Sequence, residues 1–142
     1  MTATDPLWTP SIETMLRHAP VESPMEAALL RGLLSLGDLG PPEAGAICAI
    51  DKWMLRAQQP VDHFRLDFTL SHRFGLVAIE CDGHQFHERT PEQATRDRRR
   101  DRYLTIRGWR VLRFTGTEIK RDLRWCMSDV IRMMRHVEER GI

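Results

Sequence analysis

Lysine is nearly absent from this sequence of 142 residues: Lys52 and Lys120 are the only two, and arginine supplies the remaining positive charge of the side chains. Arginine binds phosphate groups bidentately and stays charged, although the same bias arises simply in GC-rich genomes. The formal net charge at pH 7 is only +1, so the molecule as a whole is not a polycation. Attraction for a polyanion would therefore have to come from local clusters of arginine.

Cysteine is also rare, and Cys48, Cys81 and Cys126 are too widely spaced for a CxxC motif or a disulfide framework. They are expected to be buried, reduced thiols. No apolar run is long enough to cross a bilayer, and the first ten residues lack the basic and apolar regions of a secretory signal. We therefore expect a cytoplasmic protein without a membrane partner, and the length suits one domain.

Two apolar runs that carry acidic residues organise the chain. Between Phe64 and Leu70, apolar and polar residues alternate, which is typical of a strand with one buried face. Residues 76–82 begin with apolar residues on both sides, which indicates a central strand with Glu80 and Asp82 on one side of its C-terminal end. The short polar break between the two runs favours an antiparallel hairpin.

The hairpin would bring Asp67, Glu80 and Asp82 to one surface. Neighbouring carboxylates repel one another unless a cation or a proton lies among them. Hard oxygen ligands suit Mg²⁺ or Mn²⁺, so the first hypothesis is a metal site with these three residues as ligands. An alternative for Asp67 is a simple salt bridge on the strand face with Arg65 or Arg113.

Helix signals precede these strands. We expect residues 1–20 to be a peripheral segment in which Thr9 and Pro10 open a short helix. Ser23 is an N-cap candidate for a core helix, with Glu26 as its capping-box partner.

The remaining elements complete one domain over residues 21–142. Residues 53–59 are a candidate strand that pairs with the first acidic strand. A helix from Thr90 to about Arg107, a strand over 109–114 and a final helix over 117–139 follow. The order helix-strand-strand-strand-helix-strand, with an added C-terminal helix, predicts an α/β fold with a mixed four-stranded sheet flanked by helices.

The helix after the acidic strands carries a run of arginines. Local positive charge beside a metal site suits a polyanionic substrate. A solvated helix face, supported by pairs with the interleaved aspartates, is the alternative. The run comprises Arg96, Arg98, Arg99, Arg100 and Arg102.

The ordered set of motifs resembles the PD-(D/E)XK nuclease superfamily, which has the restriction-endonuclease-like fold. Within it, the chain is similar to very-short-patch-repair-endonuclease-like domains over roughly residues 21–137. The matching motifs are Ser23-Pro24-x-Glu26, Gln59-Pro60-Val61, Arg65-x-Asp67-Phe68, Ile79-Glu80-x-Asp82-Gly83, His84, His87, Asp97-x-x-Arg100, Leu104, Gly108-Trp109-x-Val111-Leu112-Arg113-Phe114 and Glu118.

The resemblance implies Mg²⁺- or Mn²⁺-dependent hydrolysis of phosphodiester bonds in DNA. Asp67 and Glu80 would hold the metal with the Cys81 carbonyl, and His84 or His87 would act as the base. Histidines in a loop are also often merely solvated, and an HxxH pair could suggest zinc, for which no fourth ligand is evident.

Glu26 would add a carboxylate from the first helix, as in many members of the superfamily. The alternative for Glu26 is the structural capping role. The residues expected to bind nucleic acid are Arg96, Arg99, Arg100 and Arg113.

One departure from the superfamily pattern concerns Asp82, which stands where the motif has a lysine that orients or activates water. Asp82 would either add a metal ligand or leave the proton transfer to histidine. A nucleic-acid-binding or partner-binding module that retains the fold is therefore the second hypothesis, and RNA cleavage is a third. So short a chain would need a homodimer, a partner protein or structural recognition of its DNA.

Overall fold

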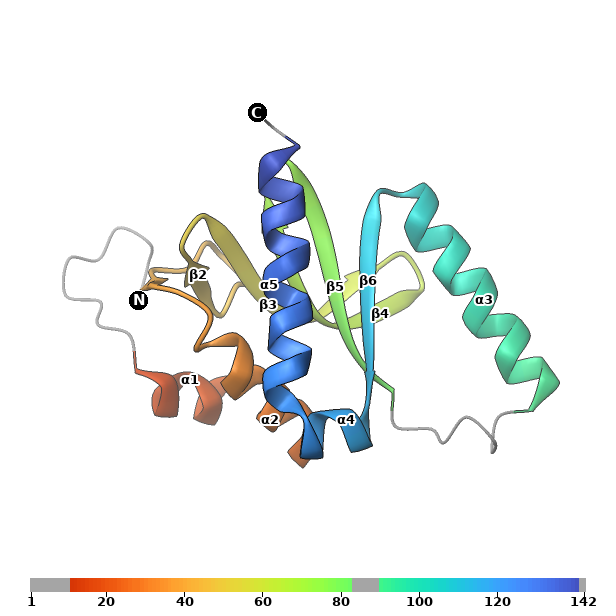
Figure 1. Ribbon diagram of the computed structural model, residues 1–142, viewed down its shortest axis with the longest axis horizontal. Helices are drawn as coiled ribbons and strands as arrows, with labels where there is room; N and C mark the ends of the chain where they lie inside the picture. Colours follow the sequence, from red (N-terminus) through yellow and green to blue (C-terminus); the bar gives the residue numbers. More distant parts are fainter. Residues whose placement is uncertain (1–10, 83–89, 141–142) are drawn as a thin grey trace.

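A mixed sheet with helices on both faces forms the body of the computed structural model, which describes residues 11–82 and 90–140 (Figure 1). The strands are β1 Leu39–Gly40, β2 Cys48–Ile50, β3 Trp53–Val61, β4 Phe64–His72, β5 Gly75–Asp82 and β6 Trp109–Thr115. The helices are α1 Ile12–His18, α2 Pro24–Leu33, α3 Pro91–Ile106, α4 Gly116–Arg121 and α5 Leu123–Glu139. None of the described helices is long and apolar enough to cross a membrane.

The six strands lie in the sheet in the order of the sequence. Neighbours are antiparallel from β1 to β5, whereas β5 and β6 are parallel and joined through the crossover helix α3. The predicted hairpin, the strand that precedes it and the parallel pair are therefore confirmed. The predicted count of four strands is wrong, because the short strands β1 and β2 extend the sheet beyond β3.

Each face of the sheet has its own hydrophobic cluster. Helices α2 and α5 cover the larger cluster, in which Leu29, Leu30 and Val130 are fully buried against β-strand residues such as Phe68 and Ile79. Helix α3 covers the smaller cluster, where Leu104 packs with residues of β4, β5 and β6. Figure 1 shows α5 crossing one face of the sheet and α3 lying beyond β6.

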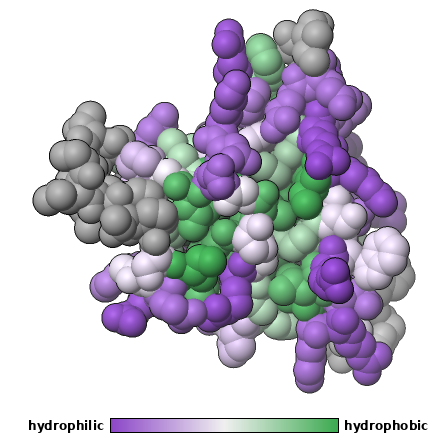
Figure 2. Space-filling model, turned by 60° about the vertical axis from the view of Figure 1, so that its left-hand side comes forward, coloured by the Kyte–Doolittle hydropathy of each residue, from purple (hydrophilic) through white to green (hydrophobic). Residues whose placement is uncertain are grey.

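Apolar side chains also reach the surface on one side of the molecule. Figure 2 shows them gathered at the centre of this face within a rim of hydrophilic residues. A pocket of about 380 Å³ lies between α1 and the chain around β2, where Met15, Ala19 and Ile47 line it.

The alternation of side chains in β4 breaks at Asp67. Phe68 belongs to the larger cluster and Leu66, two residues away, belongs to the smaller cluster. The opposite residue on β3, Gln58, has a φ of 52°, in the left-handed region that non-glycine residues rarely adopt. The predicted strand is present, but its apolar residues Leu66 and Phe68 lie in different clusters, so the expected single buried face is interrupted at Asp67.

The predicted start of helix α3 at Thr90 is confirmed, because local capping interactions determine it. Thr90 caps this helix, Pro91 takes its first position, and Gln93 completes the capping box. Helix α1 begins later than predicted: its N-cap is Ser11, and the predicted start at Thr9 lies outside the described residues.

The predicted single C-terminal helix is two helices. Thr115 caps α4 with a complete capping box, and the chain breaks at Asp122, whose φ and ψ are −132° and 41°. The predicted apolar stripe nevertheless packs against the core, because Ile119 on α4 and Cys126 and Met134 on α5 are buried in the same cluster.

Candidate active site

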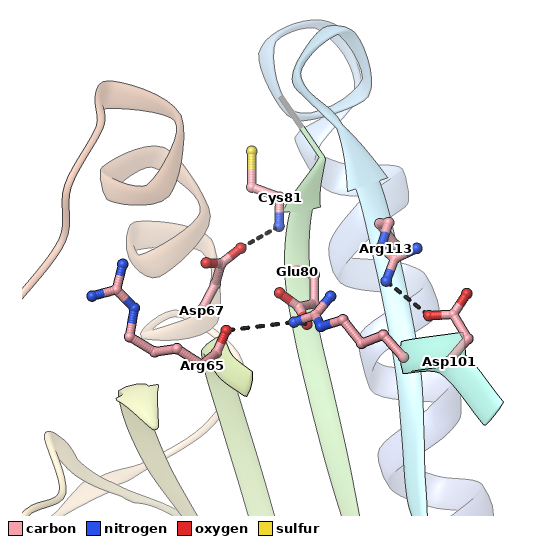
Figure 3. A network of polar contacts seen from close by, with 7 residues as sticks. Arg65, Asp67, Glu80, Cys81, Asp101 and Arg113 are labelled. Carbon is pink, nitrogen blue, oxygen red and sulfur yellow. Dashed lines mark hydrogen bonds and ion pairs between the residues drawn. The ribbon is translucent and has the colours of Figure 1, made fainter. Parts of the chain in front are cut away.

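Asp67 lies at the break in β4 and points toward the end of β5. Its Oδ2 accepts a hydrogen bond from the backbone N–H of Cys81 at 2.8 Å (Figure 3). The expected salt bridge on the strand face is absent among the described residues, because Arg65 pairs with Glu22 and Arg113 pairs with Asp101. Asp67 is therefore held by backbone and has no arginine partner in the described part of the chain.

Glu80 is one of two buried carboxylates among the described residues and is only 5% exposed. Its Oε1 accepts a hydrogen bond from Nη2 of Arg100, which reaches it from α3 and also contacts the carbonyl oxygen of Arg65. Burial raises the pKa of Glu80, the charge of Arg100 lowers it, and the charge of Asp67 raises it again, so that the pKa stays above its ordinary value. Burial therefore outweighs the favourable charge of Arg100 at this carboxyl group.

Arg113 lies beside Glu80 in the parallel register of β5 and β6 and donates a hydrogen bond to Oδ1 of Asp101 at 2.9 Å (Figure 3). Burial tends to lower the pKa of Arg113, but the charges of Asp101, Glu80 and Asp82 outweigh it and raise the pKa. Helix α3 thus pairs with both strands: its Arg100 contacts Glu80 of β5, and its Asp101 contacts Arg113 of β6. Asp101 therefore pairs with an arginine of β6 and not with one of the arginines along its own helix.

Glu26, at the start of α2, is the second buried carboxylate, 8% exposed. Its Oε2 accepts from the Ser23 hydroxyl at 3.1 Å and its Oε1 accepts from Nε2 of Gln58 at 2.6 Å. Ser23 caps the helix as predicted, but the side chain of Glu26 turns to Gln58 instead of closing the capping box. The carboxylate therefore joins the N-cap of α2 to Gln58, the residue of β3 with the left-handed backbone.

Cys81 lies among these acids. Burial first, and then the charges of Asp67, Glu26 and Asp82, raise the pKa of its thiol to about 11. The three carboxylates therefore lie close enough to act on this thiol. Glu26 from α2, Asp67 from β4 and Asp82 from β5 form one acidic region at the end of the sheet.

The other predicted site residues divide into three groups. Asp82 ends β5 opposite Thr115, the N-cap of α4. His84 and His87 lie outside the described residues. Arg96 and Arg99 are exposed on α3, whereas Arg100 and Arg113 are partly buried and form ion pairs within the protein.

Sequence reasoning did not find Gln58. It bridges β3 to Glu26, has a left-handed φ, and keeps its Oε1 buried without a hydrogen-bond partner. Nothing in a sequence marks a glutamine for such a conformation.

The donor set fits a hard divalent cation in part. Asp67 and Glu80 offer carboxylate oxygens on neighbouring strands, and hard oxygen ligands suit such an ion. Within residues 11–82 and 90–140, however, no group of three or more acidic, histidine or cysteine side chains is arranged to hold a metal. Any further protein ligand would therefore come from elsewhere in the chain or require a rearrangement.

A mixed sheet of this order, with Asp67 and Glu80 on two neighbouring central strands, is compatible with a restriction-endonuclease-like protein. Residues 47–134 match the restriction-endonuclease-like domain family REase_MTES_1575. The match spans more than half of the chain, which therefore belongs to this family. A search of curated proteins finds no match.

Proposed function

We propose that the protein is a metal-dependent endonuclease that hydrolyses phosphodiester bonds in DNA. The observation that carries the proposal is the placement of Asp67 and Glu80 on neighbouring central strands, with a raised pKa at Glu80. Membership of a restriction-endonuclease-like family supports a nuclease of this general kind. The closer resemblance to very-short-patch-repair endonucleases is part of the same proposal.

Asp67 and Glu80 would hold Mg²⁺ or Mn²⁺, with Asp82 or the Cys81 carbonyl as a further ligand. When bound, such an ion polarises the phosphate and lowers the pKa of a water molecule. The backbone hydrogen bond from Cys81 orients Asp67 before any ion arrives.

The other residues have supporting roles in this proposal. His84 or His87 would take the proton from the attacking water. Arg96 and Arg99, exposed on α3, would bind phosphates of the DNA backbone. Glu26 is oriented by Gln58 and would add negative charge near Cys81.

Cleavage of supercoiled plasmid tests the proposal, with Mg²⁺, Mn²⁺ or EDTA in parallel reactions. Wild type should nick the plasmid only with a divalent ion, and Glu80→Gln and Asp67→Asn should lose this activity. Glu139→Gln is the matched control, since Glu139 is an exposed carboxylate near the far end of α5. Equal cleavage by wild type and both site variants would refute the proposal.

The second candidate is a nucleic-acid-binding module that does not cleave, acting alone, as a homodimer or with a partner protein. Arg100 favours this candidate, because its guanidinium already supplies Glu80 with a cation inside the folded chain. Asp82, in place of a lysine, favours it too. A module of this kind would bind DNA equally well in EDTA and in Mg²⁺, and Glu80→Gln would not weaken the binding.

A further inference from the structure

The corner between α4 and α5 carries an open hollow that the proposed cleavage site does not use. Its volume is about 640 Å³. The lining residues are Lys120, Arg121, Asp122, Leu123, Arg124, Trp125 and Ser128. Here the chain ends one helix and starts the next at Asp122, so both helix ends present side chains to the same space.

Trp125 is an exposed aromatic residue that does not pack in either hydrophobic cluster. Its relative exposure is 69%, whereas Trp53 and Trp109 are 1% and 8% exposed. Its neighbours Cys126 and Met127 take the buried positions of this turn of α5. Helix α5 already buries its apolar face, so the indole of Trp125 is exposed to solvent on its other side. An exposed indole of this kind is typical of a binding surface.

The charges around Trp125 favour an anionic ligand. Three cations, Lys120, Arg121 and Arg124, line the hollow with one carboxylate, Asp122. In the described part of the chain, no ion pair engages any of these three cations. They are therefore available to phosphate groups, and cations around an exposed ring are the combination with which proteins hold single-stranded nucleic acid.

The hollow lies at the same end of the molecule as the acidic region. Thr115, the N-cap of α4, is opposite Asp82 in the register of β5 and β6. Six residues of helix then lead to the hollow, a rise of about 9 Å at about 1.5 Å per residue. Figure 1 shows α4 beside the ends of these two strands. The length of α4 corresponds to roughly three nucleotides at about 3.4 Å each, so a strand that passes the ends of β5 and β6 could continue along this helix into the hollow.

We propose that Trp125, Lys120, Arg121 and Arg124 form a binding site for a single-stranded stretch of DNA. One base stacks on the indole of Trp125, and the adjacent phosphates contact the cations. This inference rests on the proposed function, because it takes DNA as the ligand. It adds a specific preference: DNA with an unpaired segment, located a few nucleotides from the bond to be cleaved.

Binding of a fluorescently labelled single-stranded oligonucleotide in EDTA tests the site without cleavage. Stacking is worth about 1–3 kcal/mol per base, so Trp125→Ala should weaken binding by about fivefold to a hundredfold. Trp125→Phe keeps an aromatic ring and should recover most of the affinity. Phe74→Ala is the matched control, since Phe74 is a 41% exposed aromatic residue beside Arg73 at the opposite end of β5, and it should bind as wild type does.

The salt dependence of the same binding tests the cations. Each phosphate contact that is lost should lower the slope of log K against log salt by about 0.7 for single strands. Lys120→Ala, Arg121→Ala or Arg124→Ala should each show this loss. An unchanged slope in all three variants would remove phosphate binding from the proposal.

Two results would overturn the inference: undetectable binding by wild type, or equal binding by wild type and Trp125→Ala. Neither depends on cleavage, which the plasmid assay measures separately. Loss of oligonucleotide binding in Trp125→Ala, together with plasmid cleavage indifferent to Glu80→Gln, would uphold this site and refute the proposed nuclease. Metal-dependent cleavage with unaltered binding in Trp125→Ala would instead uphold the nuclease and refute this site.

Discussion

Arg100 of α3 is hydrogen-bonded to the buried carboxylate of Glu80 on β5. The two residues are 20 positions apart, and their contact fixes the crossover helix on the strand that carries the proposed site. The guanidinium lies beside an oxygen that a metal ion would need. Arg100 is therefore either an internal substitute for the ion or a cation that gives way to it.

Arg100→Gln should destabilise the protein at neutral pH by about 3 kcal/mol, because it leaves Glu80 buried without its cation. Chemical denaturation measures this loss. Arg99→Gln, an exposed arginine on the same helix, should change the stability by less than about 0.5 kcal/mol. The double variant Glu80→Gln/Arg100→Gln should regain most of the loss, since it buries no charge. Equal stability of both single variants would contradict the assigned role.

The stability of the protein should depend on pH through Glu80. Its pKa in the folded protein is raised, so the folded state binds this proton more tightly than the unfolded chain. The resulting stabilisation is complete below the unfolded pKa of about 4.3 and is lost as pH rises through the folded pKa. Glu80→Gln cannot ionise, so its unfolding free energy relative to wild type should improve as the pH rises above about 4 and through the folded pKa of Glu80. A constant difference over this range would exclude the shift.

Metal binding should compete with Arg100. If both cations use the Glu80 carboxylate, Arg100→Gln should bind Mn²⁺ more tightly than wild type, and Asp67→Asn should bind it more weakly. Electron paramagnetic resonance of free Mn²⁺ measures both without any substrate. Equal affinity of wild type and Arg100→Gln would show that the two cations do not compete.

The thiol of Cys81 should report the charge of the acidic region. Its pKa of about 11 keeps it protonated, and therefore slow to alkylate, near neutral pH. Asp67→Asn removes one of the charges that raise this pKa, so alkylation of Cys81 at about pH 9 should accelerate. Asp62→Asn, a change in the exposed turn before β4, should leave the rate unaltered. Mass spectrometry identifies the labelled residue.

Local signals predicted the parts of the fold that local interactions determine. The capping box at Thr90 placed the start of α3, and the two apolar runs placed β4 and β5 in their hairpin. Strands β1 and β2 were not predicted because two or three residues are too short for a periodic pattern. The end of α4 at Asp122 was missed because the apolar stripe continues through it.

The sequence could not specify which charges pair. The aspartates and arginines of α3 suggested pairs along the helix, yet Asp101 reaches Arg113 on β6 and Arg100 reaches Glu80 on β5. These choices depend on how α3 lies on the sheet. The left-handed backbone at Gln58 and the break in alternation at Asp67 have the same origin, since each depends on the strand opposite it.

Helix α2 belongs to the hydrophobic core of the protein but lies outside the segment that matches the family. The matched residues, 47–134, omit Leu29, Leu30 and Leu33, all fully buried in the main cluster. Each such leucine contributes about 1.5–3 kcal/mol of burial, so a fragment trimmed to the match would expose much of its interior. It would also lose Glu26. The family match therefore does not mark a fragment of this protein that could be expressed by itself, because the helix that covers one face of its sheet lies outside the match.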